Sequence, residues 1–247
     1  LAAGEETPNS ITKIISLPND KDLEIVWQIS NFYHYEGGPG RLITIGDIDT
    51  LKYEQNKQDI LNALTFGAGI IIGLYLLLLF LNRTKERGYF FLSAFIILIS
   101  LRLLFASKLI HQIIPALTSE YFLFFEYFAI FASVPLYYGL LRYLFPKETS
   151  KYIYKSLYWY AIFATLILVI TPAFIYTQLR NPSHVVIIIT MIAAFFSTIR
   201  AVIKKRPGAL FILTGLIFVS ITTVNDILFY NRIIQTTDLS HLGFVIF

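Results

Sequence analysis

The stretch "GAGIIIGLYLLLLFLNRTKERGYFFLSAF", from Gly67 to Phe95, contains the pattern that decides the fold. Apolar residues run almost unbroken to Leu81, a short polar stretch with three basic residues follows, and the apolar pattern resumes at Tyr89. A helix needs about 20 apolar residues to cross roughly 30 Å of hydrocarbon. Because no water satisfies the backbone inside a bilayer, such a span must be helical. The stretch therefore predicts two membrane helices joined by a short basic turn.

The same pattern repeats along the rest of the chain. Of its 247 residues 56% are hydrophobic and 15% are charged, with a mean hydropathy of +0.64, which lies outside the range of ordinary water-soluble domains. A seventh apolar span begins at "HLGFVIF" and is cut at Phe247. The sequence predicts an all-α polytopic membrane protein, a seven-transmembrane helix bundle over 60–247 with a truncated seventh helix. The six nearly complete spans are 60–81, 89–110, 121–145, 157–176, 185–203 and 209–229.

Basic residues in the connections predict the orientation, because cytoplasmic loops are enriched in Lys and Arg. One side carries Arg83, Lys85, Arg87, Arg142, Lys147, Lys151, Lys155, Arg200, Lys204, Lys205 and Arg206, and the other only Lys108, Arg180 and Arg232. We expect the N-terminus to be extracytoplasmic and the C-terminus cytoplasmic, with the protein in the cell (inner) membrane. The sequence pI near 9.1 then reflects topology and not nucleic-acid binding.

The segment before the first span has a different pattern. Ile25, Trp27 and Ile29 occupy every second position, as do Ile43 and Ile45, which is the period of half-buried strands. The sequence "EGGPG" between the two stretches is typical of a turn. We expect 1–48 to be the C-terminal part of an extracellular β domain. Residues 49–59 are predicted to form a helical or looped connector, capped by Asp49 or Thr50.

Three parts of the sequence resemble one known family: "SNFYHYEGGPGRLITIGD" at 30–47, the stretch at 67–95, and "VNDILFY" at 224–230. They resemble the bacterial seven-transmembrane receptors with diverse intracellular signalling modules. The resemblance implies a partial jelly-roll β-sandwich, similar to carbohydrate-binding modules, in front of the helices. It also implies a cytoplasmic output domain in the same protein, such as a cyclase, a histidine kinase or a diguanylate cyclase.

The expected function is to couple binding of an extracellular small molecule or carbohydrate to that output domain. The sequence shows no catalytic motif and no metal-ligand spacing among its four histidines, so we expect this region to be no enzyme and to hold no metal or cofactor. We expect the lipid bilayer to surround the helices. A small transporter or channel with an external β domain is the alternative.

Charged residues inside the spans are the candidate site. Arg102, Glu126 and Asp226 lie about 12, 8 and 5 Å below the outer boundary at about 1.5 Å per residue, within reach of one another if the arginine extends outward. Because a charge in the bilayer is costly, we expect the three to pair. With Asn225 they form either a static interhelical contact or a polar cluster that rearranges on ligand binding.

Small residues and prolines make further predictions about packing. Ala63 with Gly67, and Gly69 with Gly73, are spaced by four and allow close approach of another helix, within the bundle or in a homodimer. Pro135 and Pro172 interrupt the third and fourth spans and predict kinks there.

Overall fold

The computed structural model describes residues 14–17, 44–107, 109–114, 119–231, 233–234 and 236. The strands expected around Ile25 to Ile29, the turn at 36–40 and the seventh helix from 241 lie outside these residues. Within the described part, residues 44–47 form no strand, and the long elements are helices. The all-helical membrane architecture is thus present, whereas the β domain stays an expectation.

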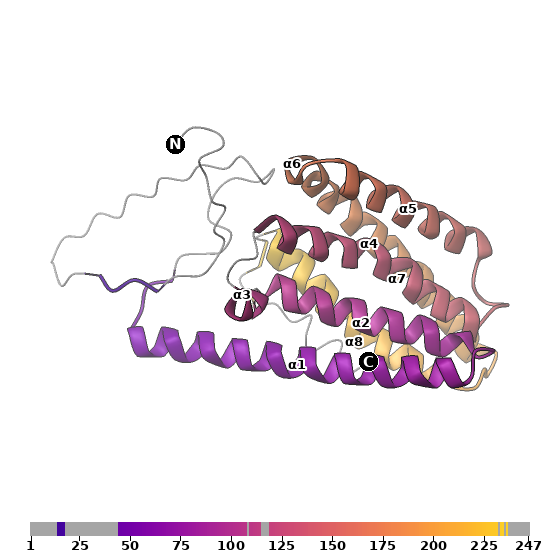
Figure 1. Cartoon of the computed structure of the whole chain (residues 1–247). Coiled ribbons are helices and arrows are strands. Elements are labelled where there is room, and N and C mark those ends of the chain that lie inside the picture. The colour runs from indigo at the N-terminus through magenta and orange to yellow at the C-terminus, as the bar shows by residue number, and fades with distance from the viewer. Residues whose placement is uncertain are drawn as a thin grey trace.

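Helix α1 (Ile48–Asn82) begins earlier than the first apolar span does (Figure 1). Its cap is Asp47, whose carboxylate accepts hydrogen bonds from the N–H groups of Asp49 at 3.1 Å and Thr50 at 3.0 Å. The cap expected at Asp49 or Thr50 was therefore wrong, because those two residues supply the unpaired N–H groups of the first turn. The connector at 49–59 is helical and continuous with the span, which makes α1 about 52 Å long at about 1.5 Å per residue.

The remaining helices confirm six apolar spans in the described part of the chain. The second, third and sixth spans correspond to α2 (Arg87–Ala106), α4 (Ser119–Leu144) and α8 (Ala209–Tyr230). The fourth is α5 (Lys151–Ile170), and the fifth is α7 (Arg180–Ile203). Three short elements complete the order: α3 (Leu109–Ile113), α6 (Ala173–Tyr176) and the 3-10 turn η1 (Thr177–Leu179).

The two prolines have different roles. Pro135 lies inside α4, where it cannot donate a hydrogen bond to the preceding turn, so a kink there stays a prediction. The kink predicted at Pro172 was wrong, because α5 ends at Ile170 and Pro172 is the N-cap of α6. Thr171 before it is extended, with φ −110° and ψ 154°, as expected for a residue that precedes proline.

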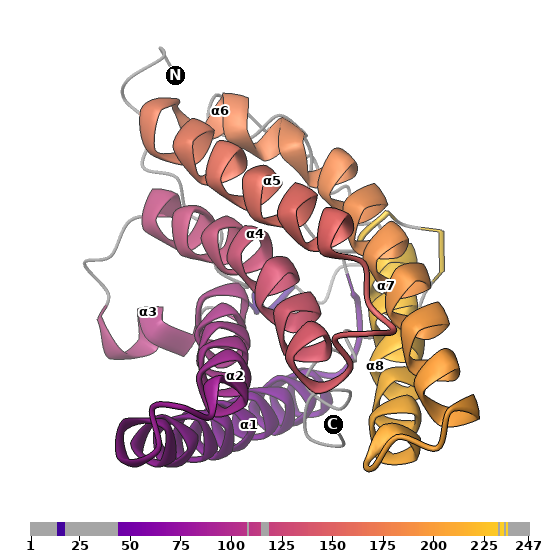
Figure 2. The same ribbon diagram turned by 90° about the vertical axis from the view of Figure 1, so that its right-hand side faces the viewer.

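The helices pack around α4 (Figure 2). Helix α2 lies between α1 and α4, α5 covers another side of α4, and α7 also contacts α4 and pairs with α8. We call the end with the turns 83–86, 145–150 and 204–208 the basic end. The opposite end, with α3 and α6, is called the α3 end.

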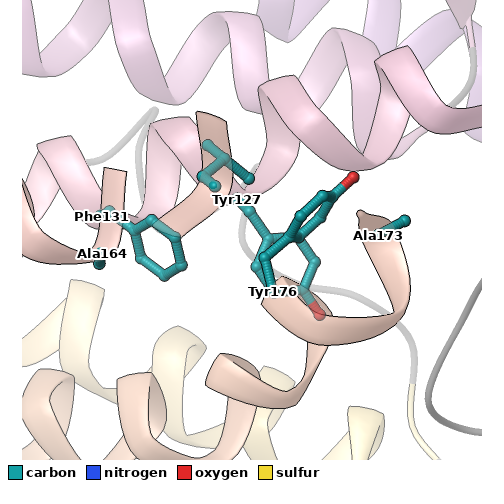
Figure 3. Close-up of a cluster of buried hydrophobic side chains, with 6 residues drawn as sticks. Tyr127, Phe131, Ala164, Ala173 and Tyr176 are labelled. Carbon is teal, nitrogen blue, oxygen red and sulfur yellow. The ribbon is translucent and has the colours of Figure 1, made fainter. Parts of the chain in front are cut away.

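Buried aromatic side chains form the core at the α3 end (Figure 3). Phe131 of α4 is fully buried, and the Tyr127 ring packs edge-on against it with ring centroids 6.0 Å apart. Tyr176 of α6 contacts Tyr127. The cluster also contains Ala164 and Leu168 of α5 and Ala173 of α6. A second cluster joins four helices through Phe95, Tyr137, Leu141, Ala194 and Leu216.

Candidate functional site

The structure brings Arg102 of α2 and Glu126 of α4 together near the α3 end. Arg102 Nη2 lies 4.0 Å from Glu126 Oε1, and both side chains are half-buried. Arg102 is one turn before the end of α2, and Glu126 is two turns into α4. The two charges therefore form an interhelical ion pair close to one end of the spans, where a polar pair is cheaper than at the centre of the bilayer.

Asn225 and Asp226 lie one turn before the end of α8, at the same end of the bundle. The Asn225 amide donates a hydrogen bond to Asp226 Oδ1 over 3.1 Å, and Asp226 is buried. The structure thus brings together a charged contact between α2 and α4 and a polar contact within α8 at the same end of the bundle. The rearranging four-residue cluster stays a prediction.

Tyr127, the neighbour of Glu126, connects α4 to the break between α5 and α7. Its hydroxyl donates a hydrogen bond to the carbonyl of Thr177 in η1 over 3.2 Å. The Thr177 hydroxyl in turn donates to Ala173 O at 2.7 Å, which holds the short segment in its bent form. One turn of α4 therefore contacts α2 through Glu126 and η1 through Tyr127.

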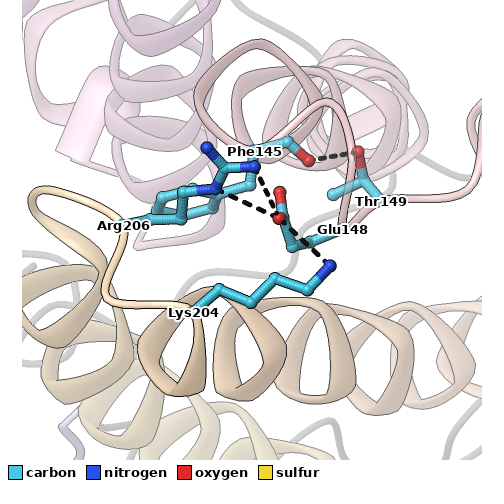
Figure 4. Close-up of polar contacts among 5 residues, drawn as sticks. All are labelled: Phe145, Glu148, Thr149, Lys204 and Arg206. Atoms are coloured by element: carbon cyan, nitrogen blue, oxygen red, sulfur yellow. Dashed lines mark hydrogen bonds and ion pairs between the residues drawn. The ribbon is translucent and has the colours of Figure 1, made fainter.

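A second charged contact centres on Glu148, in the turn between α4 and α5 at the basic end (Figure 4). Its side chain is fully buried. Oε1 accepts hydrogen bonds from Nε and Nη2 of Arg206 at 3.1 and 3.0 Å, and Lys204 Nζ lies 3.6 Å away. Glu148 thus joins the α4–α5 turn to the end of α7.

Local hydrogen bonds shape both partners of this contact. In the α4–α5 turn the carbonyl of Phe145 accepts from Glu148 N, Thr149 N and Thr149 Oγ1. Helix α7 ends with Arg206 N bonded to Ala201 O and Lys205 N bonded to Val202 O, which is a Schellman motif. Lys205 takes the left-handed position of that motif, with φ 51°.

The pKa of Glu148 reflects two opposing effects. Burial raises it, but the hydrogen bonds and positive charges of Arg206 and Lys204 outweigh burial and hold the pKa below its ordinary value of 4.5. The carboxylate is therefore ionised throughout the neutral range, and the ion pair is intact there.

The small residues of α1 fall into two groups. A Cβ at Gly73 would lie 2.5 Å from Ile97 Cγ1 of α2, and a Cβ at Gly69 would overlap the Ser100 side chain. A Cβ at Gly67 would meet nothing within 4 Å, and Ala63 is exposed. Gly69 and Gly73 therefore serve packing within the bundle, whereas a role of Ala63 and Gly67 in a homodimer stays a prediction.

Sequence reasoning missed the Glu148 contact and the Tyr127 hydrogen bond. The only local signal for the first is a single acidic residue in the basic connection "FPKETSK". An acidic residue in a basic loop points to an ion pair, but the partner is 58 residues away in the chain.

A comparison with family models gives the class of the protein. The model described as 7TM diverse intracellular signalling matches residues 58–247, and the chain belongs to this family. It is therefore a multi-pass membrane protein of a signalling receptor family, as the resemblance predicted. No curated protein and no solved structure matches the chain.

Proposed function

We propose that the chain is the transmembrane sensing region of a receptor. In this proposal an extracytoplasmic ligand bound by the N-terminal segment displaces α1, and the displacement changes the basic end in the cytoplasm. A cytoplasmic signalling domain of the same protein reads that change, and the region itself carries no catalytic step. The ligand is a carbohydrate or another small molecule, on the strength of the sequence resemblance at 30–47.

The observation that carries the proposal is α1. It is one unbroken helix from Ile48 to Asn82, so it connects the segment before the bundle with the basic end. It packs chiefly against α2, and only Asn62 and Gly73 of α1 are buried. A ligand shifts such an equilibrium only by its differential affinity for the two positions of the helix.

The positions of the charges support a receptor over a transporter or channel. Transporters place ionisable and broken-helix sites near the middle of the membrane. Arg102, Glu126 and Asp226 lie within two turns of a helix end, and all three are at the α3 end.

The predicted orientation can be tested by cysteine labelling, because the sequence contains no cysteine. Lys57 lies in the first part of α1, and Lys85 lies in the turn after α1. Both residues are exposed. With Lys57→Cys, a membrane-impermeant maleimide should react in intact cells. With Lys85→Cys it should react only after permeabilisation, and the reverse pattern would reject the orientation.

Transmission by α1 can be tested by measuring a distance at the basic end. Spin labels on cysteines replacing the exposed residues Leu81 and Phe211 report the end of α1 relative to the start of α8. The protein in nanodiscs is probed with a panel of soluble oligosaccharides, whose binding is measured separately. At least one that binds should shift the distance between the labels.

Each outcome addresses a separate part of the proposal. Oligosaccharides that bind without shifting the distance would reject transmission by α1. A panel without any binder would reject carbohydrate as the ligand class. Asn56→Pro should abolish the shift while binding persists, because proline breaks the helix, and Asn56→Ala is the matched control.

A further inference from the structure

We propose that Glu148 clamps the α4–α5 hairpin and the α7–α8 hairpin into one unit at the basic end, with the end of α1 left to move separately. This inference deepens the proposed function, because it identifies the part of the molecule that stays still while α1 is displaced. Glu148 acts here as a positioning residue between two turns.

The contact is well placed to hold the two hairpins together. A single buried carboxylate oxygen accepts hydrogen bonds from both Nε and Nη2 of Arg206 and lies close to the Lys204 ammonium. Hydrogen bonds between charged groups are shorter and stronger than neutral ones. The Glu148 side chain is buried, whereas those of Arg206 and Lys204 are partly exposed. Separating the turns would leave the buried carboxylate without its charged partners, which disfavours the separation.

The turns on both sides of the clamp are themselves rigid. The Phe145 carbonyl accepts three hydrogen bonds in the α4–α5 turn, and the Tyr138 hydroxyl accepts one from Ser150 N. On the other side the Schellman motif fixes the position of Arg206. A constraint between the two turns is therefore passed on to the helices that they join.

An apolar contact supports the ion pair. Phe145 of the α4–α5 turn is buried against Ala201 of α7 and Ala209 of α8. The two hairpins thus meet through packed side chains as well as through charge. At mid-depth the cluster of Tyr137, Leu141, Ala194 and Leu216 continues the same interface.

The α1–α2 turn has an ion pair of another kind. Arg83 Nη1 lies 3.7 Å from Glu86 Oε1, and both side chains are largely exposed. The pair joins residues three apart within one turn and does not bridge two hairpins. Exposed pairs of this sort contribute little to stability. Glu86 is therefore a matched control for Glu148 at the same end of the molecule.

The test measures the distance between spin labels at Tyr152 and Phe211, two exposed residues in the first turns of α5 and α8. The parent protein should give one narrow distance distribution. Glu148→Gln should broaden it and shift it to longer distances, and Glu86→Gln should leave it unchanged. Because Glu148 and Arg206 act on the same contact, Glu148→Gln with Arg206→Gln should broaden it no further than either single variant.

Folding is checked for each variant by circular dichroism and by elution as a single species. Should Glu148→Gln fail to fold, Lys204→Gln replaces it, because Lys204 is more exposed and should give a smaller broadening. A distribution that stays narrow in a folded Glu148 or Lys204 variant would overturn the clamp.

The oligosaccharide experiment separates the clamp from the proposed function. If a bound oligosaccharide shifts both the Leu81 to Phe211 and the Tyr152 to Phe211 distances, the rigid unit is rejected and transmission stands. If the Glu148 variants broaden the second distance but no bound oligosaccharide shifts the first, the clamp stands and transmission by α1 is rejected.

Discussion

Helices α1 and α4 are both long and apolar, but they have opposite surroundings. Helix α4 contacts α2, α5 and α7, and more than half of the residues in its apolar stretch are buried. Helix α1 packs chiefly on α2 and exposes most of its apolar side chains. Since lipid and protein interiors are equally apolar, hydrophobicity cannot distinguish the two helices. Packing does distinguish them: α4 is surrounded by other helices, whereas α1 packs chiefly on α2, as the proposed displacement of α1 requires.

The largest expected difference between the two helices is the effect of side-chain truncation. Phe131→Ala in α4 should lower the free energy of unfolding by about 3 kcal/mol, because the fully buried ring leaves a cavity. Ile71→Ala in α1 should have almost no effect, since lipid fills the space of this exposed side chain. Reversible unfolding in mixed micelles measures both. Equal losses would contradict the comparison.

Small-residue packing gives the next largest effect and tests the interface of α1 with α2. Gly73→Ala should lower the free energy of unfolding by about 1–2 kcal/mol, because its Cβ would press on Ile97. Gly67→Ala should raise it by about 0.5–1 kcal/mol, since the space is open and Ala favours a helix. The same unfolding assay should show opposite signs, and destabilisation by both would show that Gly67 also packs against protein.

Acid should weaken the Glu148 ion pair at the basic end only below the ordinary pKa of a glutamate. Because the folded-state pKa of Glu148 is lowered, its contribution is fully present above the unfolded value of 4.5. It is lost as the pH falls from 4.5 through the folded-state pKa. The distribution of Tyr152 to Phe211 distances should therefore stay narrow from pH 8 down to pH 4.5 and broaden as the pH falls through the folded-state pKa. Glu148→Gln should lack the acid transition, and a transition near neutral pH would contradict the assignment.

The smallest effect on the bundle is expected from breaking the first part of α1. Asn56→Pro should remove the amide protection of residues 48–55 in hydrogen exchange and leave the protection of α4 unchanged. Exposed Asn56 lies well before the glycines that contact α2. Loss of protection in α4 would show that the two helices are coupled more tightly than their contacts indicate.

The sequence was sufficient for the parts of the fold that depend on local pattern. Apolar length predicted six spans, because each span satisfies its own backbone in lipid. Start and end residues were less predictable. Asp47 caps α1 where Asp49 or Thr50 was expected, and Pro172 lies beyond the end of α5 where a kink was expected.

Contacts between distant residues could be predicted only where the membrane limits the choice. Arg102 and Glu126 were paired in advance because a charge in a span needs a nearby partner. Glu148 lies in a loop with several basic residues close in sequence, so nothing local selects Arg206. The choice follows from the Schellman turn and the Phe145 packing, which exist only in the folded bundle.

The first part of α1 gives the molecule a mechanical advantage. The beginning of α1 extends past the other long helices (Figure 1). Residues 48–59 span about 18 Å at about 1.5 Å per residue. Headgroups add only roughly 5–8 Å to each side of the hydrocarbon, so with the hydrocarbon beginning at the predicted span, residue 60, the start of α1 would reach past them. A sideways pull of about 3 Å at Ile48 tilts an arm of this length by about 10°. The first part of α1 would then act as a lever. A weak force that moves Ile48 over a longer path would become a larger force that moves the buried contact of α1 with α2 over a shorter path.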